Sequence, residues 1–69
     1  MSYDNKIVQF LSRQTTPIDV EKIRVAAGIG NWNTALKHLL ELYIINRISG
    51  QKTSKGWIFW KKGSGVDAA

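Results

Sequence analysis

The segment from residue 44 to residue 62 combines cationic and aromatic side chains in a pattern that suits a polyanion. It contains five basic residues and no acidic ones. It also contains the apolar block Trp57-Ile58-Phe59-Trp60. Lysine and arginine neutralise phosphates and release counterions, so an acid-free basic segment is typical of contacts with nucleic acid. The basic residues are Arg47, Lys52, Lys55, Lys61 and Lys62.

The net charge of the chain comes almost entirely from this segment. The whole chain carries a formal charge of +5 and has an isoelectric point near 9.9. Residues 1–42 hold five basic and four acidic side chains, which nearly cancel. The positive charge is therefore predicted to form a localised patch, and an anionic partner is expected.

A second group of polar residues lies just before this segment, on the polar side of a predicted helix. Asparagine suits the edge of adenine, and lysine suits guanine or phosphate. Glu41 lies among these residues and is expected to pair with Lys37, four positions earlier. For each residue taken singly, an ordinary solvated helix face is the alternative. The candidate DNA contacts on this helix are Asn31, Asn33, Thr34, Lys37 and His38.

The segment after that helix supplies the remaining candidate contacts. Short strands are predicted at residues 44–49 and 57–61, and the glycine-bounded stretch 50–56 is predicted to be a polar hairpin loop. Lysines on such a loop can contact phosphate or enter the minor groove, and a merely solubilising loop is the alternative. The candidate contacts here are Arg47, Lys52, Thr53, Lys55 and Lys61.

The composition excludes several classes of function. The chain has 69 residues, no cysteine and one histidine, so neither a disulfide nor a metal site is expected, and no cofactor is implied. No nucleophile, base and orienting group can be assembled, so the protein is predicted not to be an enzyme. No apolar run approaches the roughly 20 residues that span a bilayer, and no signal peptide is recognisable. A cytoplasmic protein without membrane contact is expected, associated with the nucleoid if the source is prokaryotic or viral.

Two helices are predicted before the polar one. The first is expected from Asp4, as its cap, to about Arg13. The second is expected to follow Asp19 as its N-cap, with Thr16 as the alternative cap, and a short extended stub at Pro17-Ile18 precedes it. Gly28 is free to take the left-handed conformation that ends this helix. The inward-facing residues are expected to be Ile7, Val8, Phe10, Leu11, Val20, Ile23 and Ala27, with Ile29 returning to the core.

The third helix is predicted from Trp32 to about Leu42, with Asn31 as its N-cap. Its apolar residues occupy one arc of a helical wheel. This arc of the third helix comprises Trp32, Ala35, Leu36, Leu39, Leu40, Leu42 and Tyr43.

Residues 1–62 are expected to form one domain, and residues 63–69 a disordered tail.

The order helix, short strand, helix, helix, strand, wing, strand resembles the winged-helix, or winged helix-turn-helix, family of DNA-binding domains over residues 4–62. The resemblance implies an α+β fold, with the third helix in the major groove and the hairpin wing on phosphates or the minor groove. It implies a non-enzymatic double-stranded DNA-binding protein, such as a small transcriptional regulator or a chromatin-type protein. Many members have glycine where this chain has Tyr43, so a different exit from the third helix is expected. The matching residues are Asp19-Val20-x-x-Ile23-x-x-x-Ala27-Gly28-Ile29, then Leu36-x-x-Leu39, then Tyr43-Ile44-Ile45.

Two other functions are consistent with the same pattern. Trp57, Ile58, Phe59 and Trp60 are apolar on both faces of the predicted strand, so the second face needs a cover. The first helix or the tail can cover this face, as can a homodimer partner, a sugar-base stack or another protein. A protein-interaction module is therefore the alternative function.

Some winged helices bind left-handed Z-form nucleic acid through an Asn and a Tyr on the third helix and a Trp in the last strand. Here Asn33 and Trp57 or Trp60 match, whereas Lys37 replaces the Tyr.

Overall fold

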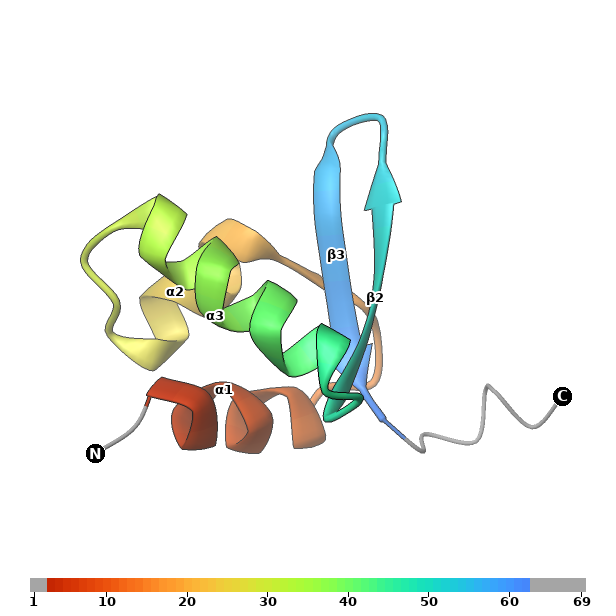
Figure 1. Cartoon of the computed structure of the whole chain (residues 1–69). Helices are drawn as coiled ribbons and strands as arrows, with labels where there is room; N and C mark the ends of the chain where they lie inside the picture. The colour runs from red at the N-terminus through yellow and green to blue at the C-terminus, as the bar shows by residue number, and fades with distance from the viewer. Residues whose placement is uncertain (1–2, 63–69) are drawn as a thin grey trace, which may run out of the picture.

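Residues 3–62 are described by the computed structural model, and they form a small α+β domain (Figure 1). Within these residues there are three helices and one three-stranded antiparallel sheet. The predicted α+β class is therefore confirmed. The predicted tail, residues 63–69, lies outside the described residues. The elements are α1 (Tyr3–Ser12), β1 (Ile18–Asp19), α2 (Val20–Ala27), α3 (Trp32–Ile44), β2 (Ile48–Thr53) and β3 (Gly56–Lys61).

Helix α1 buries the predicted face. Ile7 and Leu11 are fully buried, while Val8 and Phe10 are partly buried against the same core. Asp4 is not the cap of this helix, because it lies inside the first turn of α1 and its carboxylate faces His38.

Helix α2 has the predicted ends. The Asp19 backbone is extended, and its carboxylate accepts a hydrogen bond from the backbone N–H of Lys22 at 2.8 Å, so Asp19 rather than Thr16 is the N-cap. At the other end Gly28 has a φ of 73°, which an L side chain disfavours. The backbone N–H of Ile29 then donates to the carbonyl of Arg24 at 3.0 Å, and Ile29 is buried as predicted.

Helix α3 begins as predicted but runs on to Ile44. The Asn31 side chain accepts from the backbone N–H of Thr34 at 3.1 Å, which confirms this N-cap. Ala35, Leu39 and Leu42 face the core. The predicted inward arc is too wide, since Trp32 and Tyr43 remain 45% and 40% exposed at its edge.

The exit from α3 places Asn46 in the left-handed conformation, with a φ of 70°. The backbone N–H of Asn46 donates to the carbonyl of Tyr43 at 3.1 Å, and that of Arg47 donates to Leu42 at 2.8 Å. These paired bonds satisfy carbonyls that the helix end leaves open. Asparagine thus takes the place that glycine more often holds at such an end.

The predicted boundaries of the hairpin are wrong. Ile44 belongs to α3, and strand β2 continues through most of the stretch that was predicted to be a loop, so the turn comprises only Ser54 and Lys55. The Thr53 hydroxyl closes this turn by donating to the Gly56 carbonyl at 2.6 Å and accepting from the Lys55 N–H at 3.2 Å. The hairpin stands beside the helices with its turn projecting beyond them (Figure 1).

The sheet has the order β1-β3-β2, so β3 is its central strand. Phe59 is fully buried and pairs with Ile18 of β1 on one side and with Gly50 of β2 on the other. Ile48 of β2 is buried in the same core. No helix within residues 3–62 combines the length and the apolar character needed to cross a bilayer.

Candidate nucleic-acid interface

One face of the β2–β3 hairpin turns toward the helices and carries a lysine of the predicted set. Side chains alternate along a strand, so Trp57 lies on the same face as the core residue Phe59. Lys52 is the cross-strand partner of Trp57 and therefore shares this face. Because Lys52 is exposed, its side chain extends past the core on the helix side of the hairpin.

An aromatic cluster, defined as Tyr43, Trp57 and Phe59, joins α3 to this face of the hairpin. The ring centroids of Tyr43 and Trp57 lie 5.8 Å apart with the planes tilted by 58°. Those of Trp57 and Phe59 lie 5.7 Å apart with nearly parallel planes. Both separations are within the range of favourable ring contacts. The cluster holds the hairpin against the C-terminal half of α3.

The solvent-facing side of α3 carries Asn33, Lys37 and Glu41, all exposed. The predicted ion pair between Lys37 and Glu41 is not formed among the described residues. The two side chains therefore remain available to solvent or to a ligand. Thr34, from the same predicted set, is half-buried.

His38 contacts α1. Its Nδ1 lies 3.0 Å from Oδ1 of Asp4, and its ring meets that of Tyr3 edge-on with centroids 5.4 Å apart. His38 is half-buried in this arrangement. It lies at the α1–α3 contact, whereas Lys37 lies about 100° further around the helix. Sequence spacing placed both residues on one polar face, but the fold gives them different surroundings.

The cations predicted on the hairpin divide between its two ends. Lys52 and Lys55 lie near the turn, whereas Lys61 pairs with Ile48 at the opposite end. The Lys61 ammonium donates to the Ser12 carbonyl at 3.4 Å and so ties β3 to the end of α1. Arg47 is exposed in the connection between α3 and β2, also away from the turn. Lys52 and Lys55 are therefore the hairpin cations of the candidate interface.

The four residues predicted to contact a partner do not form one surface. Phe59 is 0% exposed and belongs to the core, so it offers no area to another molecule. Trp57 belongs to the aromatic cluster on the helix side. Ile58 and Trp60 alternate with them, lie on the outer face of the sheet, and are half-buried. On the outer face of β3, the surface available to a partner is therefore formed by Ile58 and Trp60.

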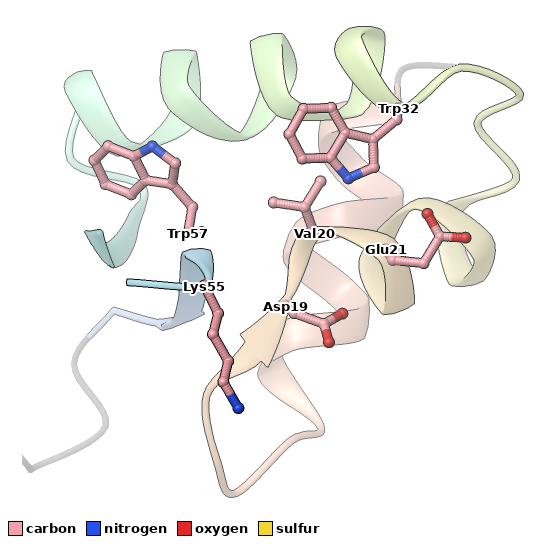
Figure 2. A pocket seen from close by; sticks show the side chains of 7 residues that line it. Asp19, Val20, Glu21, Trp32, Lys55 and Trp57 are labelled. Atoms are coloured by element: carbon pink, nitrogen blue, oxygen red, sulfur yellow. The ribbon is translucent and has the colours of Figure 1, made fainter. Parts of the chain in front are cut away.

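A pocket of about 190 Å³ opens where α2, α3 and the hairpin turn meet. Trp32 and Trp57 lie on either side of Val20, and the charged side chains of Asp19, Glu21 and Lys55 lie around these three residues (Figure 2). The pocket combines wide aromatic surfaces with charges of both signs, a mixture suited to a planar ligand that carries polar groups. The lining residues are Asp19, Val20, Glu21, Trp32, Lys55, Gly56 and Trp57.

Both acidic residues of the pocket accept hydrogen bonds from α2. One oxygen of Asp19 accepts from the backbone N–H of Lys22. Both oxygens of Glu21 accept from the Arg24 guanidinium, at 2.9 Å and 2.6 Å. These hydrogen bonds from Arg24 hold the pKa of Glu21 below its ordinary value. Within residues 3–62 no group of three potential metal ligands comes together here or elsewhere.

Sequence reasoning missed two features of this region. It assigned Trp32 to the core, although its ring lines the pocket, and it assigned Ile44 to a strand, although Ile44 is the exposed last residue of α3. One signal was present for the second feature: Leu42 to Ile45 are four consecutive apolar residues, and a helix cannot turn all of them inward.

Comparison with protein-family models, with curated proteins and with solved structures finds no match to this chain.

Proposed function

We propose that this chain is a non-enzymatic double-stranded DNA-binding protein of the winged-helix type, acting as a small transcriptional regulator or a chromatin-type protein. In this proposal α3 enters the major groove and the basic hairpin contacts phosphate or the minor groove. The observation that carries it is the pairing of Lys52 with Trp57, which itself packs on Tyr43 of α3. This arrangement supports a shared surface for the hairpin cations and the helix.

The arrangement of the other candidates supports the same proposal. Asn33 and Lys37 are exposed on the first turns of α3, the part of a recognition helix that reaches base edges. Lys55 lies in the hairpin turn, beside the pocket that also includes Trp32, the first residue of α3. The order α1, β1, α2, α3, β2, β3 is also the order of a winged helix. We assign base contacts to Asn33 and Lys37, and phosphate contacts to Lys52 and Lys55.

The test is the salt dependence of duplex binding, measured by fluorescence anisotropy. Lys52→Ala/Lys55→Ala removes two proposed phosphate contacts, so affinity should fall and the slope of log K against log salt should become shallower by about 2. Lys6→Ala/Lys22→Ala removes the same charge from exposed positions on α1 and α2 and serves as the matched control. The control should retain most of the parental slope.

Equal slopes for the two double variants would mean that net charge, not the hairpin, determines binding. Loss of affinity in Lys6→Ala/Lys22→Ala alone would mean that DNA binds to the face formed by α1 and α2 rather than to the hairpin.

The same titration on an alternating CG duplex, followed by circular dichroism, tests the Z-form alternative. Inversion of the spectrum would favour it, and an unchanged right-handed spectrum would exclude it.

A second candidate function is a protein-interaction module, and the exposed end of α3 favours it. We define the α3 end patch as Tyr43, Ile44 and Ile45, which are 40%, 76% and 61% exposed. Glu41 and Arg47 are both exposed and lie three positions before and three positions after Ile44 in the sequence. A second copy packed about a two-fold axis at Ile44 would bring each Glu41 toward the Arg47 of the other copy. The partner in this second proposal is therefore another copy of the chain.

A further inference from the structure

The pocket between α2, α3 and the hairpin turn has two indole walls and a buried apolar base. Trp32 is 45% exposed, although an indole is a costly ring to leave in water. Val20, which lies between the two indoles, is only 3% exposed (Figure 2). The ring of Trp57 is held by Tyr43 and Phe59, so this wall is in place before any ligand arrives. Such fixed indole surfaces are platforms on which planar rings stack.

The charges around the pocket favour a particular class of ligand. The Glu21 carboxylate is paired with the Arg24 guanidinium and therefore attracts a further cation only weakly, whereas the Asp19 carboxylate accepts one backbone N–H from Lys22 and keeps its charge. Lys55 also lines the pocket, and its positive charge would repel an organic cation. A planar ring joined to an anionic group matches both features, because the ring covers the indoles and the anion meets Lys55. A nucleotide has this composition.

We propose that the pocket accepts one unpaired nucleobase of the bound DNA, with Trp32 and Trp57 contacting the base and Lys55 its phosphate. The inference rests on the proposed function and deepens it, because it assigns a structural preference to the DNA. A base within an intact duplex is stacked on its neighbours and cannot enter. A bulged base is already out of the stack, so its insertion costs less. The second oxygen of Asp19 can accept from an exocyclic amino group, which favours cytosine or adenine over thymine.

The experiment compares two duplexes that are identical except for one extrahelical cytosine in the second. Anisotropy titrations at one salt concentration give the ratio of their affinities. The parent should bind the bulged duplex about tenfold more tightly, the size expected for one base stacked on an aromatic ring. Trp32→Ala should bring the ratio close to one while the affinity for the matched duplex stays the same. Trp32→Phe should keep part of the preference.

Trp60→Phe is the matched control, because Trp60 lies on the outer face of the sheet and is not part of the pocket lining. It should keep the full preference. Trp32 is chosen over Trp57 because Trp57 also supports the aromatic cluster, and thermal unfolding of each variant verifies the fold.

The two proposals fail in different ways. Equal parental affinity for the bulged and matched duplexes overturns the pocket assignment, and the DNA-binding proposal then still stands on its salt slope. A bulge preference that survives in Trp32→Ala also overturns the assignment. Absence of binding to either duplex overturns both proposals.

Discussion

Gly50 is the residue whose identity depends most directly on a neighbour across the sheet. A Cβ at this position would lie 2.6 Å and 2.7 Å from two ring carbons of Phe59. Because Phe59 is fully buried, its ring cannot swing into solvent to make room. The ring of Phe59 lies over Gly50, and this contact leaves no room for a side chain at this position of β2.

Gly50→Ala is therefore expected to lower the free energy of unfolding by about 1–3 kcal/mol through overpacking. For a domain of this size each kcal/mol corresponds to about 4–8 °C in the melting temperature. Thermal unfolding followed by circular dichroism measures the change. Gly30→Ala is the control, since a Cβ at Gly30 meets nothing within 4 Å, and its effect should stay within about 0.5 kcal/mol. Equal melting temperatures for the two variants would contradict the packing explanation.

The ends of the helices are determined by local hydrogen bonds within each element. Asp19 and Asn31 accept from the backbone three residues later, and Gly28 and Asn46 supply left-handed backbone after α2 and α3. The exit at Asn46 matters for the proposed function, because it sets the direction in which the chain enters β2. The hairpin cations are positioned through this exit.

Asn46→Ala is expected to lower the free energy of unfolding by about 1 kcal/mol, because alanine tolerates positive φ less well than asparagine. Asn46→Gly should be at least as stable as the parent, since glycine adopts this conformation without a steric penalty. Chemical denaturation gives both values. Asn33→Ala makes the same side-chain change on the exposed face of α3, where alanine's helix propensity should leave stability equal or slightly higher. Destabilisation by Asn46→Gly would contradict the assigned role.

At the scale of the described domain, the α3 end patch and the two hairpin cations lie on different parts of the structure. Lys52 and Lys55 lie toward the hairpin turn, whereas the α3 end patch lies where α3 leads into β2. A chain of 69 residues has a small core, and association of two copies would add burial that one copy lacks. The proposed DNA binding and the proposed self-association therefore use separate parts of the domain.

If the α3 end patch is the interface between copies, Ile44→Gln/Ile45→Gln should convert a dimer to a monomer without loss of the fold. Sedimentation equilibrium across a concentration series measures the state. Val25→Gln is the control, because Val25 is 63% exposed on α2 and lies outside the patch. It should leave the dimer intact. A parent that stays monomeric at all concentrations would exclude this interface.

Several features of the protein follow from short-range rules and were predicted from the residues alone. The caps at Asp19 and Asn31, the left-handed Gly28 and the buried stripe of α2 depend on side chains and backbone groups within a few positions of one another. The three helices, the hairpin and the localisation of charge in the C-terminal half follow from the same patterns. Local sequence is sufficient where both partners of an interaction lie within one or two turns.

The remaining features depend on contacts between distant segments. Gly50 lies under the Phe59 ring because β2 pairs with β3. His38 faces Asp4 because α1 packs on α3, and Trp32 lines a pocket because the hairpin turn lies nearby. A helical wheel or an alternation pattern gives the direction of a side chain, but it does not say which surface will meet it. That surface exists only once the elements have packed, so the candidate interface became definable only in three dimensions.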